Sequence, residues 1–210
     1  MSRLVDDVLE QVALNPGSID IREHLPTLKE YASKCDHVTE FGVRWVISTW
    51  ALIAGSPKTL ESFDINHYKT WGVDEKILNE AATEAGVYFK FWQDDVLKTD
   101  KLVETDMLFI DTLHSYKQLK MELYLHAHKV KKYLVFHDIV SFGFMDEADV
   151  YDTGGWPEHL QNYYSELDDS KKGISPAIEE FLSDNSREWE VDKKFENNNG
   201  LLILRRKSNA

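Results

Sequence analysis

The sequence is poor in cysteine, because Cys35 is the only residue of this type in 210. A single cysteine excludes an internal disulfide and a zinc site built from several thiolates. Cys35 stands just before the first expected strand, and no reactive motif surrounds it. We therefore expect a buried or half-buried structural thiol.

Long apolar runs and an excess of basic residues are also missing. No stretch approaches the roughly 20 apolar residues that cross a bilayer, and the start MSRLVDDVLEQV has acids where a signal peptide is apolar. The 24 Lys and Arg are outnumbered by 37 Asp and Glu, which gives a net charge of −13. This charge repels nucleic acid. We expect a cytoplasmic protein with a small-molecule substrate and no membrane or nucleic-acid partner; a homodimer stays an open alternative to a monomer.

The chain is long enough for one sizeable core, and its pattern predicts a single α/β domain over 1–210. Apolar residues at helical spacing predict two leading helices, at 3–14 and 21–34, in a helical cap over 1–36. Strands and helices then alternate, which predicts a doubly wound, mainly parallel sheet with helices on both faces. The expected strands are 37–41, 59–64, 87–92, 106–111 and 132–137, and the expected helices between them are 47–54, 74–85 and 115–131.

The last third of the chain has a different pattern. After a helix at 174–183, two strands at 187–195 and 200–207 are joined by Asn197-Asn198-Asn199-Gly200, which predicts an antiparallel hairpin that closes the sheet. The segment 141–172 is rich in aromatic and acidic residues, and we expect an irregular substrate lid there. Its aromatic residues include Phe142, Phe144, Tyr151, Trp156, Tyr163 and Tyr164.

Polar clusters end two of the apolar strands. LFIDTLHSY (108–116) brings Asp111 and His114, and YLVFHDIVSFG (133–143) brings His137 and Asp138. Open parallel sheets bind ligands at the carboxyl ends of their strands, so these clusters indicate an active site. The alternative is a set of strand-end polar groups that cap nearby loops and helix amides.

The first three strands also end in candidate ligand contacts. In TEFGVRWVISTWALIAG (39–55), Glu40 and Gly42 end the strand and Ser48 opens a helix, so backbone amides and a bare Cα can meet a ligand. The sequence lacks GxGxxG here, which counts against a nicotinamide or flavin enzyme. Asp64 ends the second strand, where it can accept hydrogen bonds from a ribose. Asp94 and Asp95 end the third strand, near the place of an adenine. A tight turn and solvated aspartates are the alternatives.

Together the residues at these three strand tips have an order and spacing that resemble those of the class I S-adenosylmethionine-dependent methyltransferases. Further matching segments are DTLHSY, FHD, GISPAIEEFL and NNNGLLIL, and the whole resemblance covers 37–206. It is strongest to the small group that includes macrocin O-methyltransferase and the cephalosporin hydroxylase-like proteins. The resemblance implies a Rossmann-like sheet of seven strands with an antiparallel C-terminal strand, bound S-adenosylmethionine and, in some relatives, a divalent metal such as Mg²⁺.

The resemblance also assigns residues. Glu40 and Gly42 would lie under the methionine, Asp64 on the ribose, and Asp94 or Asp95 near the adenine. The cofactor-binding residues expected on this basis are Glu40, Phe41, Gly42, Trp45, Ser48, Asp64, Asp94, Asp95 and Asp111, although the Phe41 side chain by itself is a core candidate. Trp45 and Val46 replace a glycine-containing turn of many members, so we expect Trp45 against the cofactor.

The same resemblance makes the strands that end at Asp111 and Asp138 neighbours. Adjacent strands lie about 4.8 Å apart, so the two carboxylates can share one ion or one proton. The expected catalytic residues are His114, His137 and Asp138, and the expected metal ligands are Asp111, His137 and Asp138. The implied function is O-methylation of a small hydroxylated acceptor such as a sugar or another metabolite. The alternatives are a metal-dependent, hydroxylase-like enzyme and a non-catalytic scaffold, which the Trp45-Val46 turn favours.

Overall fold

The computed structural model describes residues 3–147 and 157–208, and a seven-stranded sheet forms its centre. The strands are β1 (His37–Phe41), β2 (Thr59–Asp64), β3 (Tyr88–Gln93), β4 (Thr105–Ile110), β5 (Val130–His137), β6 (Trp189–Phe195) and β7 (Leu201–Arg206). Their order is β3-β2-β1-β4-β5-β7-β6. β1 to β5 pair in parallel, and β7 runs antiparallel to both β5 and β6. The predicted mainly parallel sheet and its antiparallel hairpin are confirmed.

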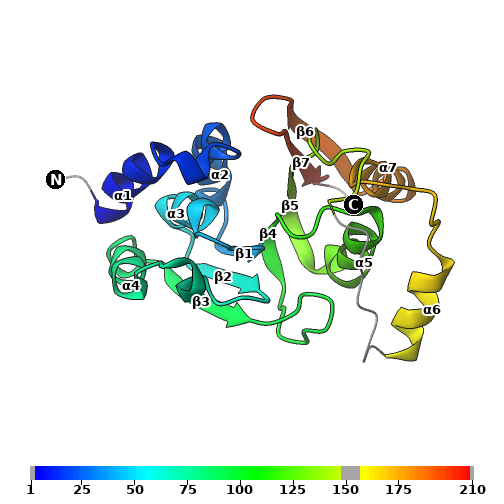
Figure 1. Cartoon of the computed structure of the whole chain (residues 1–210), viewed down its shortest axis with the longest axis horizontal. Coiled ribbons are helices and arrows are strands. Elements are labelled where there is room, and N and C mark those ends of the chain that lie inside the picture. The colour runs from blue at the N-terminus through cyan, green and yellow to red at the C-terminus, as the bar shows by residue number, and fades with distance from the viewer. Residues whose placement is uncertain (1–2, 148–156, 209–210) are drawn as a thin grey trace.

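Helices cover both faces of this sheet (Figure 1). One face carries α1 (Leu4–Ala13), α2 (Leu25–Ala32), α3 (Ile47–Ala54) and α4 (Glu75–Glu84), and the other carries α5 (Tyr116–His126), α6 (Glu158–Glu166) and α7 (Ser175–Asp184). Successive side chains of a strand point to opposite faces. Phe109 and Val135 accordingly lie in the core on the α3 side, whereas Leu108 and Phe136 lie in the core on the α5 side.

The leading helices extend one of these helical layers. α1 and α2 both pack on α3, and Arg3 donates a hydrogen bond to the carbonyl of Ala54 at the end of α3. The predicted helix 21–34 is shorter than expected. A 3₁₀ turn, η2 (Arg22–His24), precedes α2, because Pro26 suits the first turn of a helix but not its interior. η2 reaches the hairpin turn between β6 and β7, where His24 contacts the carbonyl of Asn197.

Two further boundaries differ from the predictions. The expected helix 115–131 ends at His126, and the 3₁₀ turn η4 (Ala127–Lys129) leads into β5. The segment 141–172 is not irregular throughout, because α6 lies within it. Leu160 of α6 is buried, and Tyr163 stacks on Tyr124 of α5 with ring centroids 4.2 Å apart. Tyr151 and Trp156 of the expected lid lie outside the described residues.

Cys35 is buried, as expected for a structural thiol. Its Sγ lies 3.3 Å from the carbonyl oxygen of Tyr31, and burial raises the pKa of the thiol to about 12. Among the described residues, none of the helices has the length and apolar character needed to cross a membrane.

Candidate functional site

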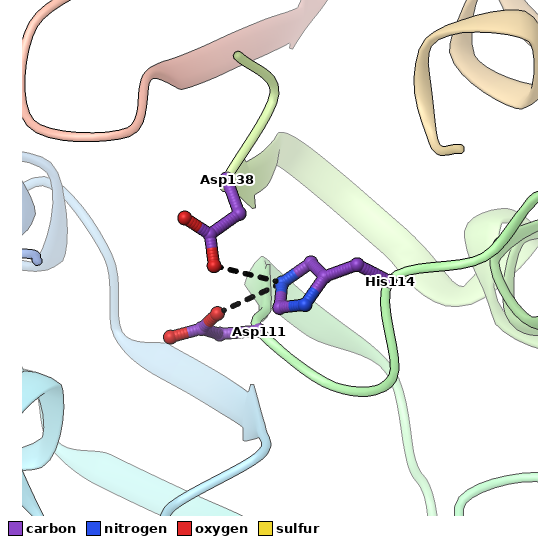
Figure 2. A group of neighbouring side chains, drawn as sticks. All are labelled: Asp111, His114 and Asp138. Atoms are coloured by element: carbon purple, nitrogen blue, oxygen red, sulfur yellow. Dashed lines mark hydrogen bonds and ion pairs between the residues drawn. The ribbon is translucent and has the colours of Figure 1, made fainter. Parts of the chain in front are cut away.

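The polar cluster lies at the carboxyl ends of β4 and β5, next to the point where the strand order reverses. Asp111 directly follows β4, Asp138 directly follows β5, and His114 lies in the turn before α5. Figure 2 shows the three side chains pointing toward one another. His114 Nε2 is 3.2 Å from Asp111 Oδ1 and 3.4 Å from Asp138 Oδ2. One ligand atom from each residue lies within 4.8 Å of the others, which is a spacing suited to a metal ion.

The charges of this cluster depend on one another. Burial disfavours ionisation of Asp111, but the imidazoles of His137 and His114 outweigh burial and lower its pKa. Burial also disfavours the charged form of His114, but Asp111 and Glu147 outweigh it and raise the pKa of His114 to about 10. For Asp138, burial is the largest influence and raises the pKa. Without a cation, the cluster therefore keeps a proton on His114 at neutral pH.

A turn from the expected lid segment holds the other side of His114. His114 Nδ1 is 2.9 Å from Glu147 Oε2, and the Phe142 ring stacks on the imidazole with centroids 5.1 Å apart. This turn lies against Gly173, where an added Cβ would be 2.5 Å from the carbonyl oxygen of Gly143. Residues 141–147 are thus fixed on the cluster. The sequence analysis missed Glu147, whose only signal was its place in an acidic stretch.

His137 lies behind the two carboxylates. Its Nδ1 is 3.3 Å from Asp111 Oδ1 and 3.7 Å from Asp138 Oδ2. The side chain is 1% exposed, and its Nε2 has no hydrogen-bond partner among the described residues. A substrate hydroxyl does not reach Nε2 in this conformation, so the geometry does not favour the expected role of His137 as general base. Two of the predicted metal ligands, Asp111 and Asp138, belong to a group of side chains with donor atoms spaced for one metal ion, and the third member of this group is His114.

The N-terminal segment supplies a neighbour of His137 that the sequence analysis missed. The ring of His24 meets that of His137 edge to face, with centroids 5.8 Å apart. His24 Nε2 lies 3.0 Å from the carbonyl oxygen of Asn197 and 3.1 Å from that of Asn198. Two carbonyl acceptors require a proton on this nitrogen. No local pattern in the sequence around His24 indicated this contact, because it joins distant parts of the chain.

The tips of β1, β2 and β3 form the neighbouring part of the site. Glu40 does not face it, because its fully buried carboxylate accepts hydrogen bonds from three hydroxyl groups: Ser48 at 2.5 Å, Thr49 at 2.8 Å and Ser62 at 2.6 Å. Burial raises the pKa of Glu40 to about 7, although these hydrogen bonds oppose the shift. The side chains of Glu40 and Ser48 therefore join β1, β2 and α3, and their predicted contact with a cofactor stays a prediction.

The first turn depends on Gly42. Its φ is +83°, and an added Cβ would lie 2.0 Å from the carbonyl oxygen of Asp111. Val46, at the start of α3, also has a positive φ of 56°, which strains a β-branched residue. The Trp45 side chain is 37% exposed and meets Trp71 edge to face, with centroids 5.8 Å apart. It lies at the surface of the first turn and outside the core.

The carboxylates of Asp64, Asp94 and Asp95 accept hydrogen bonds from the loops at the tips of β1, β2 and β3. Asp64 accepts hydrogen bonds from the backbone amides of Val43, Arg44 and Asn66. Asp94 accepts from Thr99 and Lys101, and Asp95 from the amide of Leu97. The Phe41 side chain lies in the core between Phe63 and His126, and its carbonyl oxygen accepts from the amide of Asp111. The Phe41 side chain therefore belongs to the core, and the predicted cofactor contact of this residue stays a prediction.

No model of a known protein family matches the chain, and no curated protein matches its sequence. Solved structures share its fold. A methyltransferase from Geobacter sulfurreducens has a TM-score of 0.59 at 15% identity, over 97% of this chain and 88% of that one. An O-methyltransferase from Bacillus cereus, crystallised with S-adenosylhomocysteine (SAH), has a TM-score of 0.54 at 13% identity, over 99% and 92%.

The N-methyltransferase NodS from Bradyrhizobium japonicum has a TM-score of 0.50 at 12% identity, over 91% of this chain and 97% of that one. Methyltransferases for oxygen and for nitrogen thus share this architecture, and they do not single out the macrocin-like group. The strand order, the antiparallel β7 and these similarities lead to one conclusion about the fold: the chain has the Rossmann-like fold that these methyltransferases share.

Proposed function

We propose that the protein transfers a methyl group from S-adenosylmethionine to an oxygen of a small hydroxylated acceptor, such as a sugar or another metabolite. The observation that carries this proposal is the convergence of Asp111, His114 and Asp138 at the tips of β4 and β5. The tip of β4 lies beside that of β1, at the point where open parallel sheets bind ligands. The Bacillus cereus structure, with its bound SAH, supports the choice of cofactor.

We propose a divalent cation at Asp111, His114 and Asp138. Their donor atoms are close enough to share one ion, and Asp138 Oδ1 is a buried oxygen without a hydrogen-bond partner among the described residues. Carboxylates suit Mg²⁺ and Mn²⁺, whereas an imidazole ligand favours Mn²⁺ and later transition metals over Mg²⁺. The residues therefore fit a cation, and their donor set favours Mn²⁺. Such an ion would lower the pKa of an acceptor hydroxyl and orient its oxygen.

The surrounding side chains have positioning roles in this proposal. Glu147 and Phe142 fix the ring of His114, and His137 orients Asp111 through the 3.3 Å contact of Nδ1. The side chain of Asp111 is 25% exposed, compared with 11% for Asp138. Asp111 is thus the more accessible of the two carboxylates. The main requirement of methyl transfer is alignment of the acceptor oxygen with the methyl group, and fixed side chains supply it.

We further propose that Asp64 binds the ribose and that Asp94 or Asp95 lies near the adenine. An ionised carboxylate offers about four acceptor positions. Three amide donors already bond Asp64, so there is room for a ribose hydroxyl. Because the same carboxylate holds the first turn, cofactor binding and the conformation of that turn should depend on each other.

Calorimetric titration of the protein with S-adenosylmethionine and SAH tests the cofactor. We expect both to bind, and we expect Asp64→Ala to weaken binding by about 1–3 kcal/mol through lost hydrogen bonds. If the folded wild-type protein bound neither ligand, the proposal would fail. Binding without turnover across a broad acceptor panel would instead indicate a scaffold, an alternative that the compared structures do not support.

The cation is tested with Asp111→Asn and Asp138→Asn. Each variant loses one carboxylate ligand, so we expect metal-dependent turnover to fall at least about 100-fold, while affinity for S-adenosylmethionine stays nearly unchanged. Activity that persisted in chelator in both variants would contradict the metal site and leave the methyltransferase proposal standing.

A further inference from the structure

Glu122 is a buried acidic residue that the proposed reaction does not use directly. It lies on the inner side of α5 and is 0% exposed. Its Oε1 accepts hydrogen bonds from Thr112 Oγ1 and Gln118 Nε2, both at 2.7 Å. Burying a carboxylate is costly unless its hydrogen bonds compensate. A fold that keeps Glu122 at this position therefore needs the contacts that it makes.

The contact with Thr112 links Glu122 to the cluster. Thr112 directly follows Asp111 and lies two residues before His114. Gln118 belongs to the first turns of α5, so one carboxylate oxygen joins the turn 111–115 to the helix that follows it. The side chains of Glu122, Thr112, His114 and His137 also line one cavity of about 10 Å³. Glu122 thus lies directly behind the cluster.

The two oxygens of Glu122 have different surroundings. Oε1 receives both hydrogen bonds, while Oε2 is buried without a partner among the described residues. Among the described residues, no donor therefore lies where it would conflict with an –NH₂ group in the position of Oε2. A glutamine at this position can keep Oε1 as the acceptor for Thr112, whereas a methionine of similar length cannot. These two substitutions separate the hydrogen bond from simple filling of space.

We propose that Glu122 is a positioning residue, which holds Thr112 and thereby fixes Asp111 and His114 in the geometry that binds the cation. This inference rests on the proposed cation site. Partners that orient metal ligands typically change metal affinity by about 10- to 100-fold when they are removed. Glu122 acts on the ligands through the backbone of the turn and is not itself a ligand. Among the described residues, the side chains with donor atoms spaced for one ion are those of Asp111, His114 and Asp138.

The test is calorimetric titration of the purified protein with Mn²⁺ and, separately, with S-adenosylmethionine. We expect Glu122→Met and Thr112→Val each to raise the Kd for Mn²⁺ about 10-fold or more. The double variant should resemble the single variants, because both changes remove the same link. Glu122→Gln should bind Mn²⁺ within about 3-fold of wild type because it keeps the acceptor oxygen. Affinity for S-adenosylmethionine should stay unchanged in all of them.

Glu61→Met is a matched control. Glu61 is a buried carboxylate on β2, bonded by Trp92 Nε1 at 3.1 Å, and it is not part of the cluster. Its replacement should leave the Kd for Mn²⁺ unchanged. If Thr112→Val and a folded Glu122→Met both bound Mn²⁺ like wild type, the positioning role would be refuted.

A second readout separates failure of this inference from failure of the proposed cation site. If wild type binds no Mn²⁺, the cation site fails, and amide hydrogen exchange of the metal-free protein still tests Glu122. The amides of His114 and Ser115 bond to Glu147 Oε2 and the carbonyl of Leu113. In Glu122→Met and Thr112→Val these two amides should exchange about 10-fold faster while the sheet stays protected. Unchanged local exchange would overturn the inference.

Discussion

The tips of β1 and β2 and the tips of β4 and β5 use acidic residues in opposite ways. In the first region, Glu40 is bonded by three neutral hydroxyl groups and Asp64 by three backbone amides. In the second, Asp111 and Asp138 share the ionisable ring of His114. Neutral donors hold a carboxylate without exchanging a proton with it. The first region is thus suited to holding the shape of its turns, whereas the second has the ionisable groups on which the proposed cation site depends.

Gly42 is where the two regions meet. An alanine Cβ at this position would lie 2.0 Å from the carbonyl oxygen of Asp111, with φ at +83°. We expect Gly42→Ala to lower the free energy of unfolding by about 4 kcal/mol, because the backbone of the β4 tip must move. Urea denaturation followed by circular dichroism measures this loss.

Gly86→Ala is the matched control for that substitution. Gly86 also has a positive φ, of +74°, but an added Cβ meets nothing within 4 Å. Gly86→Ala should therefore lower the free energy of unfolding by only about 1–2 kcal/mol, the cost of placing a Cβ at a positive φ. Equal losses in the two variants would show that the close approach of β1 to β4 is unimportant.

Glu40 predicts a dependence of stability on pH. Burial raises its folded-state pKa from 4.5 to about 7. Between these values the folded protein keeps a proton that the unfolded chain has lost, so this contribution is full below pH 4.5 and disappears as pH rises through 7. The difference is about 3 kcal/mol. Burial also raises the pKa of Glu122 to about 7, so its contribution to stability changes with pH in the same direction.

In Glu40→Gln the free energy of unfolding should therefore fall less steeply between pH 5 and pH 7.5. The slope should decrease by roughly the contribution of one titrating proton. Denaturant unfolding of wild type and variant at several pH values measures the two slopes. An unchanged slope in Glu40→Gln would mean that Glu40 is already ionised across this range. Its protonation would then not distinguish it from the carboxylates that contact His114.

The smallest expected effect concerns Trp45. The indole is partly exposed and contacts Trp71 and Arg44 at the tip of β1, so its removal should cost little stability. We expect Trp45→Ala to weaken binding of S-adenosylmethionine about 5-fold, near 1 kcal/mol, if the indole packs on the cofactor. Calorimetry and a thermal melt measure the two quantities. A large fall in Tm with unchanged affinity would make the indole a structural residue.

The sequence predicted the succession of strands and helices along the chain and the residues at the strand tips, because both depend on local patterns. Apolar runs define β4 and β5, and the polar residues that follow them, Asp111 and Asp138, fall at the sheet edge by necessity. Side-chain direction was less predictable. The resemblance placed Glu40 at a cofactor, but residue alternation along β1 turns it toward α3 and its hydroxyls.

Contacts between distant segments were beyond sequence reasoning. Glu147 reaches His114 across 33 positions, and His24 reaches Asn197 across 173. Neither contact has a local pattern, since each depends on how separate elements pack. α6 was missed for a related reason: it has few buried residues, with Leu160 as the described one, so its periodicity was weak beside the aromatic and acidic composition of the segment.

The turn between β6 and β7 has a consequence for how the protein is made. Asn198 donates a hydrogen bond to Ile19 and Asn199 accepts one from Val140, so one turn near the C-terminus holds both the N-terminal segment and the loop that follows Asp138. Ribosomes synthesise chains from the N-terminus. The contacts of Ile19 and His24 with this turn can therefore form only after residues 197–199 have been synthesised, and contacts of such long range slow folding. The contact between His24 and His137 should be among the last to form.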